Sequence, residues 1–509
     1  MGRSGGASLS LIQDITEFVR VTTMAAAHPK PLILWFRRDL RLADNPALAH
    51  AVATRRPIIP VYIFDNAGEG RPRGAASLWW LDKSLRALSD ALAATGASLI
   101  LRRGDSEAEL RRLIAETGAD AVIMNRLFEP DAWTRDADIA HGLKNEGVEC
   151  RGFNGALLST PGSVLTGSGG PYKVFTPFKN ALLGSAGPPA LTAAPHAIDT
   201  VADLDSDRLN DWGLHPTRPD WSGGFDWTPG EAGAAEALSA FTTSALASYS
   251  KGRDHPAEVG GSRLSPHLHW GEVHPWRVVA SVRKAADDGH APRAEADKFI
   301  AEIAWREFSA HLLHAFPRIV DRSFRPEYDA FPWRDDDAGF TAWTRGQTGY
   351  PIVDAGLRQL WSLGWMHNRV RMIVASFLMK DLLIDWRRGE AWFWDTLVDA
   401  DLANNVQNWQ WVAGSGADAS PFFRVFNPVT QGQKFDAAGA YVRRWIPELR
   451  GLPDKWIHAP WTAPPEILRE AGVRLGQDYP RPIVDHAEAR DRALAALKAI
   501  ANSKYDDQA

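Results

Sequence analysis

The strongest constraint on the fold is a change of pattern along the chain. Between about Pro31 and Arg151, short apolar runs (LILWF, IIPVYIF, SLILRRG and AVIMN) alternate with stretches of helical periodicity, including Ala75 to Ala94 and Glu107 to Thr117. This alternation predicts a doubly wound parallel sheet with helices on both faces. The segment after the first run, WFRRDLRLADNP, is not a glycine-rich phosphate loop, so a conventional dinucleotide-binding domain is not expected.

The second half of the sequence has a different period. After about Glu231 the strand signals fade, and apolar residues recur at helical spacing in Ala296–His314, Tyr350–Leu363, Met366–Leu383 and Ala391–Val398. This part is predicted to be all-helical. The chain between the halves is rich in Gly, Pro, Ser and Ala, which indicates a long connector. Its aromatic part, TGSGGPYKVFTPF (Thr166 to Phe178), is expected to pack against a domain.

These patterns divide the 509 residues into segments. We predict a disordered leader (1–30, with Met24 as an alternative start), an α/β domain (31–157), a connector (158–230), a helical domain (231–500) and a short tail (501–509).

Composition excludes several classes of protein. No run of eighteen apolar residues suggests a membrane span, and the first 30 residues lack the pattern of a secretory signal. The single Cys150 rules out disulfides within the chain and an all-cysteine iron–sulfur cluster, and it fits a cytoplasmic location. A net charge of −5 argues against a generally basic nucleic-acid binder, although a local basic patch stays compatible with it. No metal site is expected.

Tryptophan is the outlier, with 22 residues against 8 tyrosines. The most unusual segment, DADLANNVQNWQW, runs from Asp399 to Trp411 and combines acids, amides and two tryptophans. It is unlike a surface loop, and its polar groups would need partners in an ordinary core. It therefore suggests a segment that holds a large, polar, aromatic ligand.

Two helical stretches mix apolar and polar side chains on one face. In GWMHNRVRM, Trp365, Asn368, Arg369 and Met372 share a face, which suits either a pocket wall or a partly buried helix edge. In FIAEIAWREF, Glu302 lies one turn before Trp305 and Arg306. Taken alone, this spacing favours a Glu302–Arg306 salt bridge over a functional carboxylate.

A third stretch, GGSRLSP, lies just before a predicted helix. Its backbone N–H groups and hydroxyls suit a diphosphate. A serine-capped helix start is the alternative, and it is the preferred one on this segment alone.

Together, these stretches resemble the DNA photolyase and cryptochrome family from about Pro31 to Leu497. The resemblance rests on an ordered series of motifs: WFRRDLRLADNP, GGSRLSPHLHWG, IAWREF, TGYPIVDAGLRQL, GWMHNRVRMIVASFLMKDLLIDWRRGE, DADLANN, NWQWVAGSGADASPFFRVFNPVTQGQKFD and YVRRWIPEL. It implies the family's architecture: an N-terminal α/β domain, a connector and a C-terminal helical domain that binds a folded flavin adenine dinucleotide (FAD).

The resemblance also implies which residues hold FAD. Arg371 pairs with Asp399, the segment Asp399–Ala400–Asp401 meets the flavin edge and sugar-side atoms, and Asn405 faces flavin N5. An amide there offers both a donor and an acceptor. The residues implied to bind the FAD phosphates are Tyr249, Gly261, Ser262, Arg263, Leu264 and Ser265.

Electron transfer and substrate binding are implied in the same way. Trp409, Trp386 and Trp333 stand at the family's electron-transfer positions, running from the flavin to the surface. Damaged DNA is the implied partner, with a cyclobutane pyrimidine dimer flipped out of the duplex. The residues implied to meet it are the aromatic walls Trp305 and Trp411, the hydrogen-bonding Glu302 and Asn368, and the cations Arg253, Arg306 and Arg369.

The resemblance therefore predicts a light-driven, FAD-dependent dimer photolyase that acts as a monomer. One rival is a (6-4) photolyase, which carries histidines where this chain has Asn368 and Met372. His367 is adjacent but is expected to point to another helix face. The other rival is a blue-light-sensing cryptochrome without repair activity. Cryptochromes often have a long tail, whereas about a dozen residues follow the family's usual end here.

A second chromophore, methenyltetrahydrofolate or a deazaflavin, is compatible with the resemblance. Its expected segment, NRLFEPDAWTRD (Asn125 to Asp136), has Asp131 and Ala132 where the folate pattern has Asn and Glu. The sequence leaves the identity and presence of this antenna open.

Overall fold

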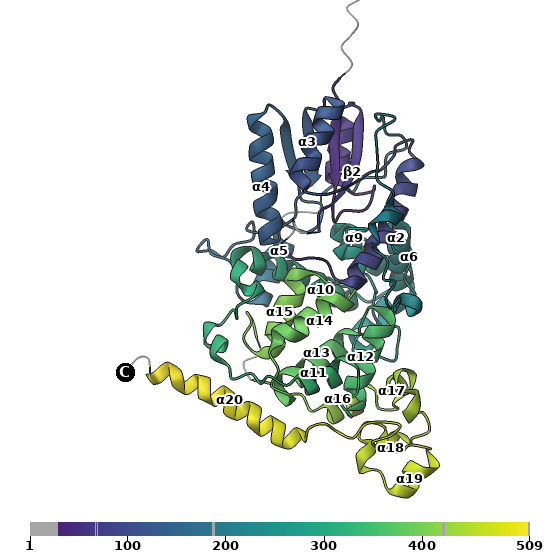
Figure 1. Cartoon of the computed structure of the whole chain (residues 1–509), viewed down its shortest axis with the longest axis vertical. Helices are drawn as coiled ribbons and strands as arrows, with labels where there is room; N and C mark the ends of the chain where they lie inside the picture. Colours follow the sequence, from purple (N-terminus) through teal and green to yellow (C-terminus); the bar gives the residue numbers. More distant parts are fainter. Residues whose placement is uncertain (1–28, 67, 69, 186–188, 420–422, 507–509) are drawn as a thin grey trace, which may run out of the picture.

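The computed structural model describes residues 29–506 except 67, 69, 186–188 and 420–422 (Figure 1). The predicted leader therefore lies almost wholly outside the described residues. An N-terminal α/β domain stacks on a larger helical domain, and the C-terminal helix extends along the far side of the latter.

The α/β domain contains a five-stranded parallel sheet in the order β3-β2-β1-β4-β5. Its strands are β1 (Leu32–Phe36), β2 (Ile58–Phe64), β3 (Ile100–Arg103), β4 (Ala121–Asn125) and β5 (Glu149–Phe153). The apolar runs of the sequence predicted the first four. The edge strand β5, ECRGF, is only partly buried, so it lacks the apolar run that marks a central strand.

Helices cover both faces of this sheet, as predicted. The helices are α1 (Pro46–Ala53), α2 (Ala75–Ala93), α3 (Ser106–Thr117) and α4 (Pro130–Asn145). Leu32 and Leu34 of β1 pack with α1 and α2, whereas Ile33 and Trp35 of the same strand pack with α3 and α4. Alternate side chains of one strand thus serve opposite cores.

The connector has more structure than its composition suggests. It contains α5 (Phe175–Gly184) and two short 3₁₀ turns, Leu209–Trp212 and Ser222–Gly224. Phe175 and Phe178 are buried in the core of the helical domain, so the aromatic segment does pack down.

In the described part of the chain after Glu231, the regular elements are helices. They are α6 (Glu231–Ala240), η3 (Phe241–Ala245), η4 (Leu246–Ser248), α7 (Tyr249–Gly252), α8 (Ser265–His269), α9 (Pro275–Asp287), α10 (Arg293–Ala315), η5 (Pro317–Val320), η6 (Pro326–Ala330), α11 (Asp337–Thr344), α12 (Pro351–Leu363), α13 (Asn368–Ser376), η7 (Phe377–Asp381), α14 (Trp386–Thr396), α15 (Leu402–Ala413), α16 (Pro428–Phe435), α17 (Ala440–Trp445), η8 (Pro447–Leu449), α18 (Asp454–Ile457), η9 (Pro460–Thr462), α19 (Pro465–Glu470) and α20 (His486–Asp506).

One predicted helix boundary was wrong. The helix expected over Met366–Leu383 begins at Asn368, where the His367 side chain accepts the N–H of Arg369, and it changes to a π-helical turn over Phe377–Asp381. Gly364 ends the preceding helix with a φ of 63°, so Trp365 lies in the turn between them. The expected tail from residue 501 continues α20 to Asp506.

The domains are joined by several polar contacts. Arg277 of α9 forms two bonds to Asp44, 2.7 and 3.0 Å long, and Glu272 accepts the indole N–H of Trp80 at 2.9 Å. The indole N–H of Trp394 donates to the Pro72 carbonyl at 2.8 Å. Within the described residues, no helix is long and apolar enough to cross a bilayer.

Gly74 lies at a point of close backbone contact in this interface. A Cβ at Gly74 would lie 2.2 Å from the Trp394 carbonyl oxygen and 2.4 Å from the Asp395 Cα. We expect Gly74→Ala to lower the free energy of unfolding by about 1–3 kcal/mol, because backbone must move to relieve the overlap. Thermal unfolding tests this against Gly223→Ala, where the added Cβ meets nothing within 4 Å. Equal melting temperatures for the two variants would contradict the assignment.

Candidate functional site

The acid–amide–tryptophan segment forms the start and body of α15. Asp401 caps the helix by accepting the N–H of Asn404, and Gly414 ends it with a φ of 91°. Asn405 and Trp409 lie one turn apart and are both buried. The polar residues of the segment therefore include a helix cap and a buried amide on a structured element.

Buried Asn405 contacts a carboxylate that the sequence did not single out. Its Nδ2 donates to Glu390 Oε1 at 2.7 Å and to the Glu390 carbonyl at 3.0 Å. Glu390 is 5 % exposed and also binds the Arg71 guanidinium at 2.8 and 2.9 Å. The signal that could have revealed Glu390 is its place among the aromatic residues of WRRGEAWFW, since a carboxylate there needs partners.

Of the expected electron-transfer tryptophans, the last one is the most exposed. Trp409 and Trp386 are buried, whereas Trp333 is only partly buried. Trp409 packs directly on α14, because a Cβ at Gly389 would lie 2.2 Å from its ring. Gly389 is three residues after Trp386 in α14, so it brings Trp409 to the helix face that carries Trp386. This order agrees with a path from interior to surface.

Arg371 lies against Asp399, with Nη2–O distances of 3.1 and 2.8 Å. Asp401, two residues later in the sequence, has other hydrogen-bond partners. Its carboxylate accepts Asn404 N and Nδ2 at 2.9 and 2.7 Å and lies 3.3 Å from His269 Nδ1.

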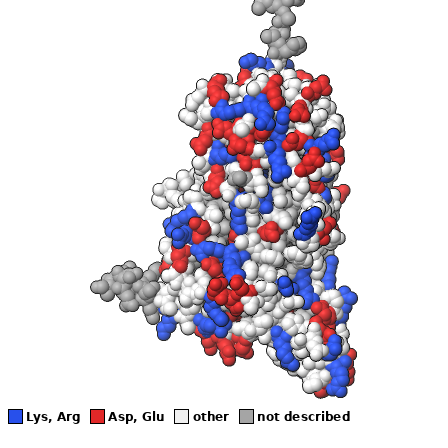
Figure 2. Space-filling model, viewed as in Figure 1, with Lys and Arg blue, Asp and Glu red and all other residues white. Residues whose placement is uncertain are grey.

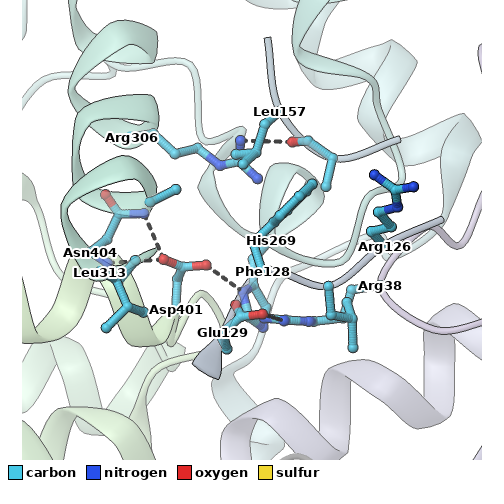
Figure 3. Close-up of a pocket in the computed structure, with 14 residues that line it drawn as sticks. Arg38, Arg126, Phe128, Glu129, Leu157, His269, Arg306, Leu313, Asp401 and Asn404 are labelled. Carbon is cyan, nitrogen blue, oxygen red and sulfur yellow. Dashed lines mark hydrogen bonds and ion pairs between the residues drawn. The ribbon is translucent and has the colours of Figure 1, made fainter. Parts of the chain in front are cut away.

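Asp401 also borders a pocket between the domains (Figure 3). Residues 126–129, at the start of the expected antenna segment, form the α/β side of this pocket, and His269 and Arg306 face them. Arg38 binds Glu129 at its edge. Figure 3 shows Asp401 pointing toward His269 from the helical side.

The GGSRLSP segment has the open side that a phosphate group requires. Gly260 is packed against Gly252, whose carbonyl oxygen would lie 2.2 Å from an added Cβ, whereas a Cβ at Gly261 would meet nothing within 4 Å. Arg263 has a φ of 53°, and Leu264 N donates to Ser262 Oγ at 3.3 Å. Ser265 opens the short helix α8 and accepts the Trp365 indole N–H at 3.4 Å. These residues fit the FAD phosphates implied by the resemblance.

Tyr249 lies beside the residues that the resemblance gives to DNA. Its ring is edge-on to Phe299 at 5.2 Å, and the Arg253 guanidinium lies 5.4 Å from the ring centroid. Burial raises the pKa of the Tyr249 phenol, so it stays a neutral hydroxyl. Tyr249 thus lies next to Arg253, one of the cations that the resemblance assigns to DNA.

The Glu302–Arg306 salt bridge expected from spacing alone is not formed. Glu302 instead pairs with Arg253 and lies 3.7 Å from Lys298. Arg306 donates to the carbonyls of Ala156 at 2.9 Å and Leu268 at 3.1 Å, and it borders the interdomain pocket. Its reach to these carbonyls is the physical reason that the local pair does not form. Both Nη atoms of Arg306 are therefore engaged within the protein, one by the α/β domain and one by the helical domain.

The remaining expected lesion residues lie on α10, α13 and α15. Trp305 is partly buried and stacks on Phe175 with centroids 3.7 Å apart and planes inclined by 7°. The Trp411 indole N–H donates to the Asp418 carbonyl at 3.0 Å. Asn368 is exposed at the start of α13, and Met372 follows one turn later, partly buried.

The segment after α7 links α10 to α13. Arg253 holds Glu302 of α10, and its neighbour Asp254 accepts Arg369 Nη2 of α13 at 2.7 Å. Adjacent residues of one segment thus hold residues of two helices that are remote in sequence. The charges that the resemblance gives to DNA binding converge in this way.

His367 differs from its neighbours. It is buried, and burial lowers its pKa to about 4, so it is neutral near pH 7. Its ring accepts the Arg369 N–H at 3.2 Å and so caps α13. His367 therefore precedes the helix and caps it, whereas the sequence placed it on another face of that helix.

Comparisons with known proteins agree with this architecture. A family model described as DNA photolyase matches residues 32–196, and one described as the FAD binding domain of DNA photolyase matches 299–499. The chain is 52% identical to a deoxyribodipyrimidine photo-lyase of Agrobacterium fabrum, covering 92% of this chain and 98% of the relative. It is 38% identical to cryptochrome-1 of Arabidopsis thaliana, covering 91% of this chain and 70% of the relative.

A solved structure, that of a bacterial class III photolyase from Agrobacterium tumefaciens, matches with a TM-score of 0.92 and 51% identity, covering 94% of this chain and 100% of that one. The fold and the matched domains define a flavoprotein with an α/β domain and a helical FAD-binding domain. The chain belongs to the DNA photolyase and cryptochrome family.

The lowered pKa of His367 predicts that the folding stability of the protein depends on pH. The unfolded chain binds a proton at this histidine below about pH 6.5, but the folded protein does so only below about pH 4. Stability is therefore lost as the pH falls through this window. Over this pH range, the free energy of unfolding should fall less in His367→Asn, which keeps a helix-capping acceptor, than in the unmodified protein. The two losses should differ by up to roughly 3 kcal/mol. Melting temperatures between pH 7 and pH 4 measure it.

The control for this experiment is the exposed His290. His290→Asn should follow the pH profile of the unmodified protein. Parallel profiles for His367→Asn and the unmodified protein would show that the buried ring does not carry the pH dependence.

Proposed function

We propose that the protein is a light-driven DNA repair enzyme that splits cyclobutane pyrimidine dimers. The observation that carries the proposal is the convergence of Glu302 and Arg369 on the adjacent residues Arg253 and Asp254, next to the Asn368 start of α13. It places a carboxylate, an amide and cations where helices α10 and α13 meet. Similarity to a photo-lyase at 52% identity, against 38% for a plant cryptochrome, supports repair over signalling.

When bound, reduced FAD supplies one electron from its light-excited state to the dimer and recovers it after the ring splits. The chain binds and orients both partners. Residues 261–265 and Tyr249 hold the phosphates, Arg371 and Asp399 meet the flavin edge, and Asn405 hydrogen-bonds at N5. Trp305 and Trp411 enclose the flipped dimer, Glu302 and Asn368 accept or donate at the base edges, and Arg253 and Arg369 contact the lesion or its phosphates.

The alternatives are less well supported. A (6-4) photolyase would need histidines at Asn368 and Met372 for proton transfer. The nearby His367 is buried, and its ring caps α13. Repair is distinguished from a signalling role by loss of thymine dimers from irradiated DNA under blue light, compared with darkness.

We infer that the interdomain pocket is the place for a second chromophore. Its α/β wall comes from residues 126–129, and it offers the cations Arg38 and Arg126 beside the apolar Phe128. This combination suits a flat, partly anionic molecule. Extraction of the purified protein, with absorption spectra of the released chromophores, distinguishes a folate from a deazaflavin or from FAD alone.

We also propose that the protein acts as a monomer in the cytoplasm. Figure 2 shows basic and acidic side chains interspersed over both domains on the face in view. Light scattering of the flavin-loaded protein tests the monomer.

Glu302 gives the sharpest test of lesion binding. We expect Glu302→Ala to weaken binding of dimer-containing DNA by about ten- to a hundredfold, since a hydrogen bond to a charged group contributes roughly 1.5–3 kcal/mol. The repair yield per absorbed photon should also fall at saturating DNA. Binding is measured in darkness, and yield under blue light at matched flavin content.

Glu295→Ala is the matched control, because Glu295 also lies on α10 but accepts Ser250 N and Oγ at 2.5 and 2.7 Å. Glu302→Gln separates charge from hydrogen bonding. Affinity and yield in Glu302→Ala equal to those of the control would leave Glu302 as a structural partner of Arg253 alone.

Trp409 tests the electron path. Trp409→Phe should retain flavin but lose most photoreduction of oxidised flavin, because phenylalanine is far harder to oxidise than tryptophan. Repair after chemical reduction should persist, since repair uses the flavin's own electron. The measurement is flavin bleaching under blue light with an external reductant. Trp361 stacks on Trp392 of α14 with ring centroids 6.0 Å apart, so it is the candidate for a bypass. Normal photoreduction in Trp409→Phe would refute the path, unless the double variant Trp409→Phe/Trp361→Phe loses photoreduction.

A further inference from the structure

A partly buried ion pair connects the α/β domain to the amide that the proposed function places at the flavin. Arg71 lies in the segment between β2 and α2, Glu390 on α14 and Asn405 on α15. The Arg71 guanidinium binds both Glu390 oxygens, at 2.8 and 2.9 Å. Glu390 in turn accepts from Asn405 Nδ2. Residues separated by more than 300 positions thus form one continuous chain of contacts.

The contacts of Asn405 fix which end of its amide faces outward. A primary amide has two N–H donors on nitrogen and lone pairs only on oxygen. Both contacts of Nδ2 lie on the same residue, one to the carboxylate and one to the main-chain carbonyl of Glu390. An ionised carboxylate can only accept, so the nitrogen must face Glu390. Oδ1 is then the end left to accept a hydrogen bond from a ligand.

We propose that Arg71 and Glu390 are positioning residues that hold the Asn405 oxygen toward the flavin N5. In this way the α/β domain influences the cofactor through a single ion pair. The inference rests on the proposed function, in which Asn405 faces N5. An oxygen acceptor there favours the reduced flavin, which carries a hydrogen at N5, over the oxidised flavin, which does not.

Arg71 is needed because Glu390 is buried. Burial raises the pKa of its carboxyl, and the Arg71 guanidinium offsets part of that rise. Without Arg71, Glu390 would take up a proton more readily and become a donor. A protonated carboxyl can donate to the Asn405 oxygen, which allows the amide to turn and present its nitrogen to the flavin.

Other charges on the elements around α14 have partners of their own. Those elements are α2, α15 and η7. Asp82 of α2 is bonded by Lys83 and Arg86, and in η7 Lys380 donates to the Ala413 carbonyl while Asp381 is bonded by His486. On α14 itself, Arg387 and Arg388 pair with Asp385 and Asp337, and Asp395 accepts the Ala75 N–H; α15 carries no charged residue. Among the described residues, Arg71 is the cation that forms an ion pair with Glu390.

The test measures the flavin and not only repair. Glu390→Gln and Arg71→Met are compared with Arg71→Lys in the flavin-loaded protein. The ratio of reduced to oxidised flavin is followed spectroscopically at fixed potentials between pH 6 and pH 9. We expect Glu390→Gln to lower this ratio by about two- to tenfold, which corresponds to the loss of one hydrogen bond.

The pH profile separates positioning from a general electrostatic effect. In Arg71→Met, the flavin ratio should show an additional titration step as the pH changes. The ratio should equal that of Glu390→Gln at low pH and approach that of the unmodified protein at high pH. The step should be missing from Arg71→Lys, which keeps the charge. It should also vanish from the double variant Arg71→Met/Glu390→Gln, which lacks the titrating carboxyl.

The matched control removes another interdomain ion pair. Arg277→Met breaks a two-bond contact with the buried Asp44 that resembles the Arg71–Glu390 contact. It should leave the flavin ratio and its pH profile unchanged. If Glu390→Gln and Arg71→Met behave like Arg277→Met, the positioning role is overturned. Glu390→Gln, which keeps the side-chain shape, decides the matter if Arg71→Met does not retain flavin.

A further variant separates this inference from the proposed function. Asn405→Leu removes the amide altogether. If it leaves the flavin ratio unchanged, Asn405 does not face N5 and the proposed cofactor site fails. If it shifts the ratio but Glu390→Gln does not, only the positioning role fails.

Discussion

The packing of α15 on α14 is the contact on which the site depends. It brings two positions of each helix into register, so that Asn405 meets Glu390 and Trp409 meets Gly389. Any side chain at Gly389 would push Trp409 away, because a Cβ there would lie 2.2 Å from the indole ring. One helix pair therefore fixes both the amide proposed to face the flavin and the tryptophan proposed to reduce it.

The same α14 is held from the other side by the α/β domain. The Trp394 indole N–H donates to the Pro72 carbonyl, Asp395 accepts the Ala75 N–H at 2.9 Å, and Glu390 binds Arg71. These contacts surround Gly74, where no side chain fits. The α/β domain is thus a structural support for the helix that carries part of the cofactor site, as well as a neighbour of the interdomain pocket.

The sequence predicted elements wherever one period dominated. The buried strands LILWF and IIPVYIF and the helix over Ala75–Ala93 are examples, because local burial and period agree there. It failed where a tertiary contact decided the outcome. The spacing of Glu302 and Arg306 suggested a local pair, but Arg306 reaches carbonyls of Ala156 and Leu268 in distant segments. Glu390 was missed for the same reason, since its partner Arg71 lies in the other domain.

Stability alone does not explain the Arg71–Glu390–Asn405 chain. An ion pair must overcome the cost of removing charge from water, which here falls mainly on the buried Glu390 because Arg71 stays partly exposed, and apolar residues of similar volume often do as well or better. What an apolar side chain cannot do is accept a hydrogen bond from an amide. With hydrocarbon at position 390, the Asn405 amide would keep only the main-chain carbonyl as an acceptor, whereas the carboxylate adds a second acceptor and so strengthens the preference for the nitrogen. The specific property gained from the ion pair is therefore a firmer orientation of Asn405, which is the property that matters at a flavin whose N5 gains and loses a hydrogen.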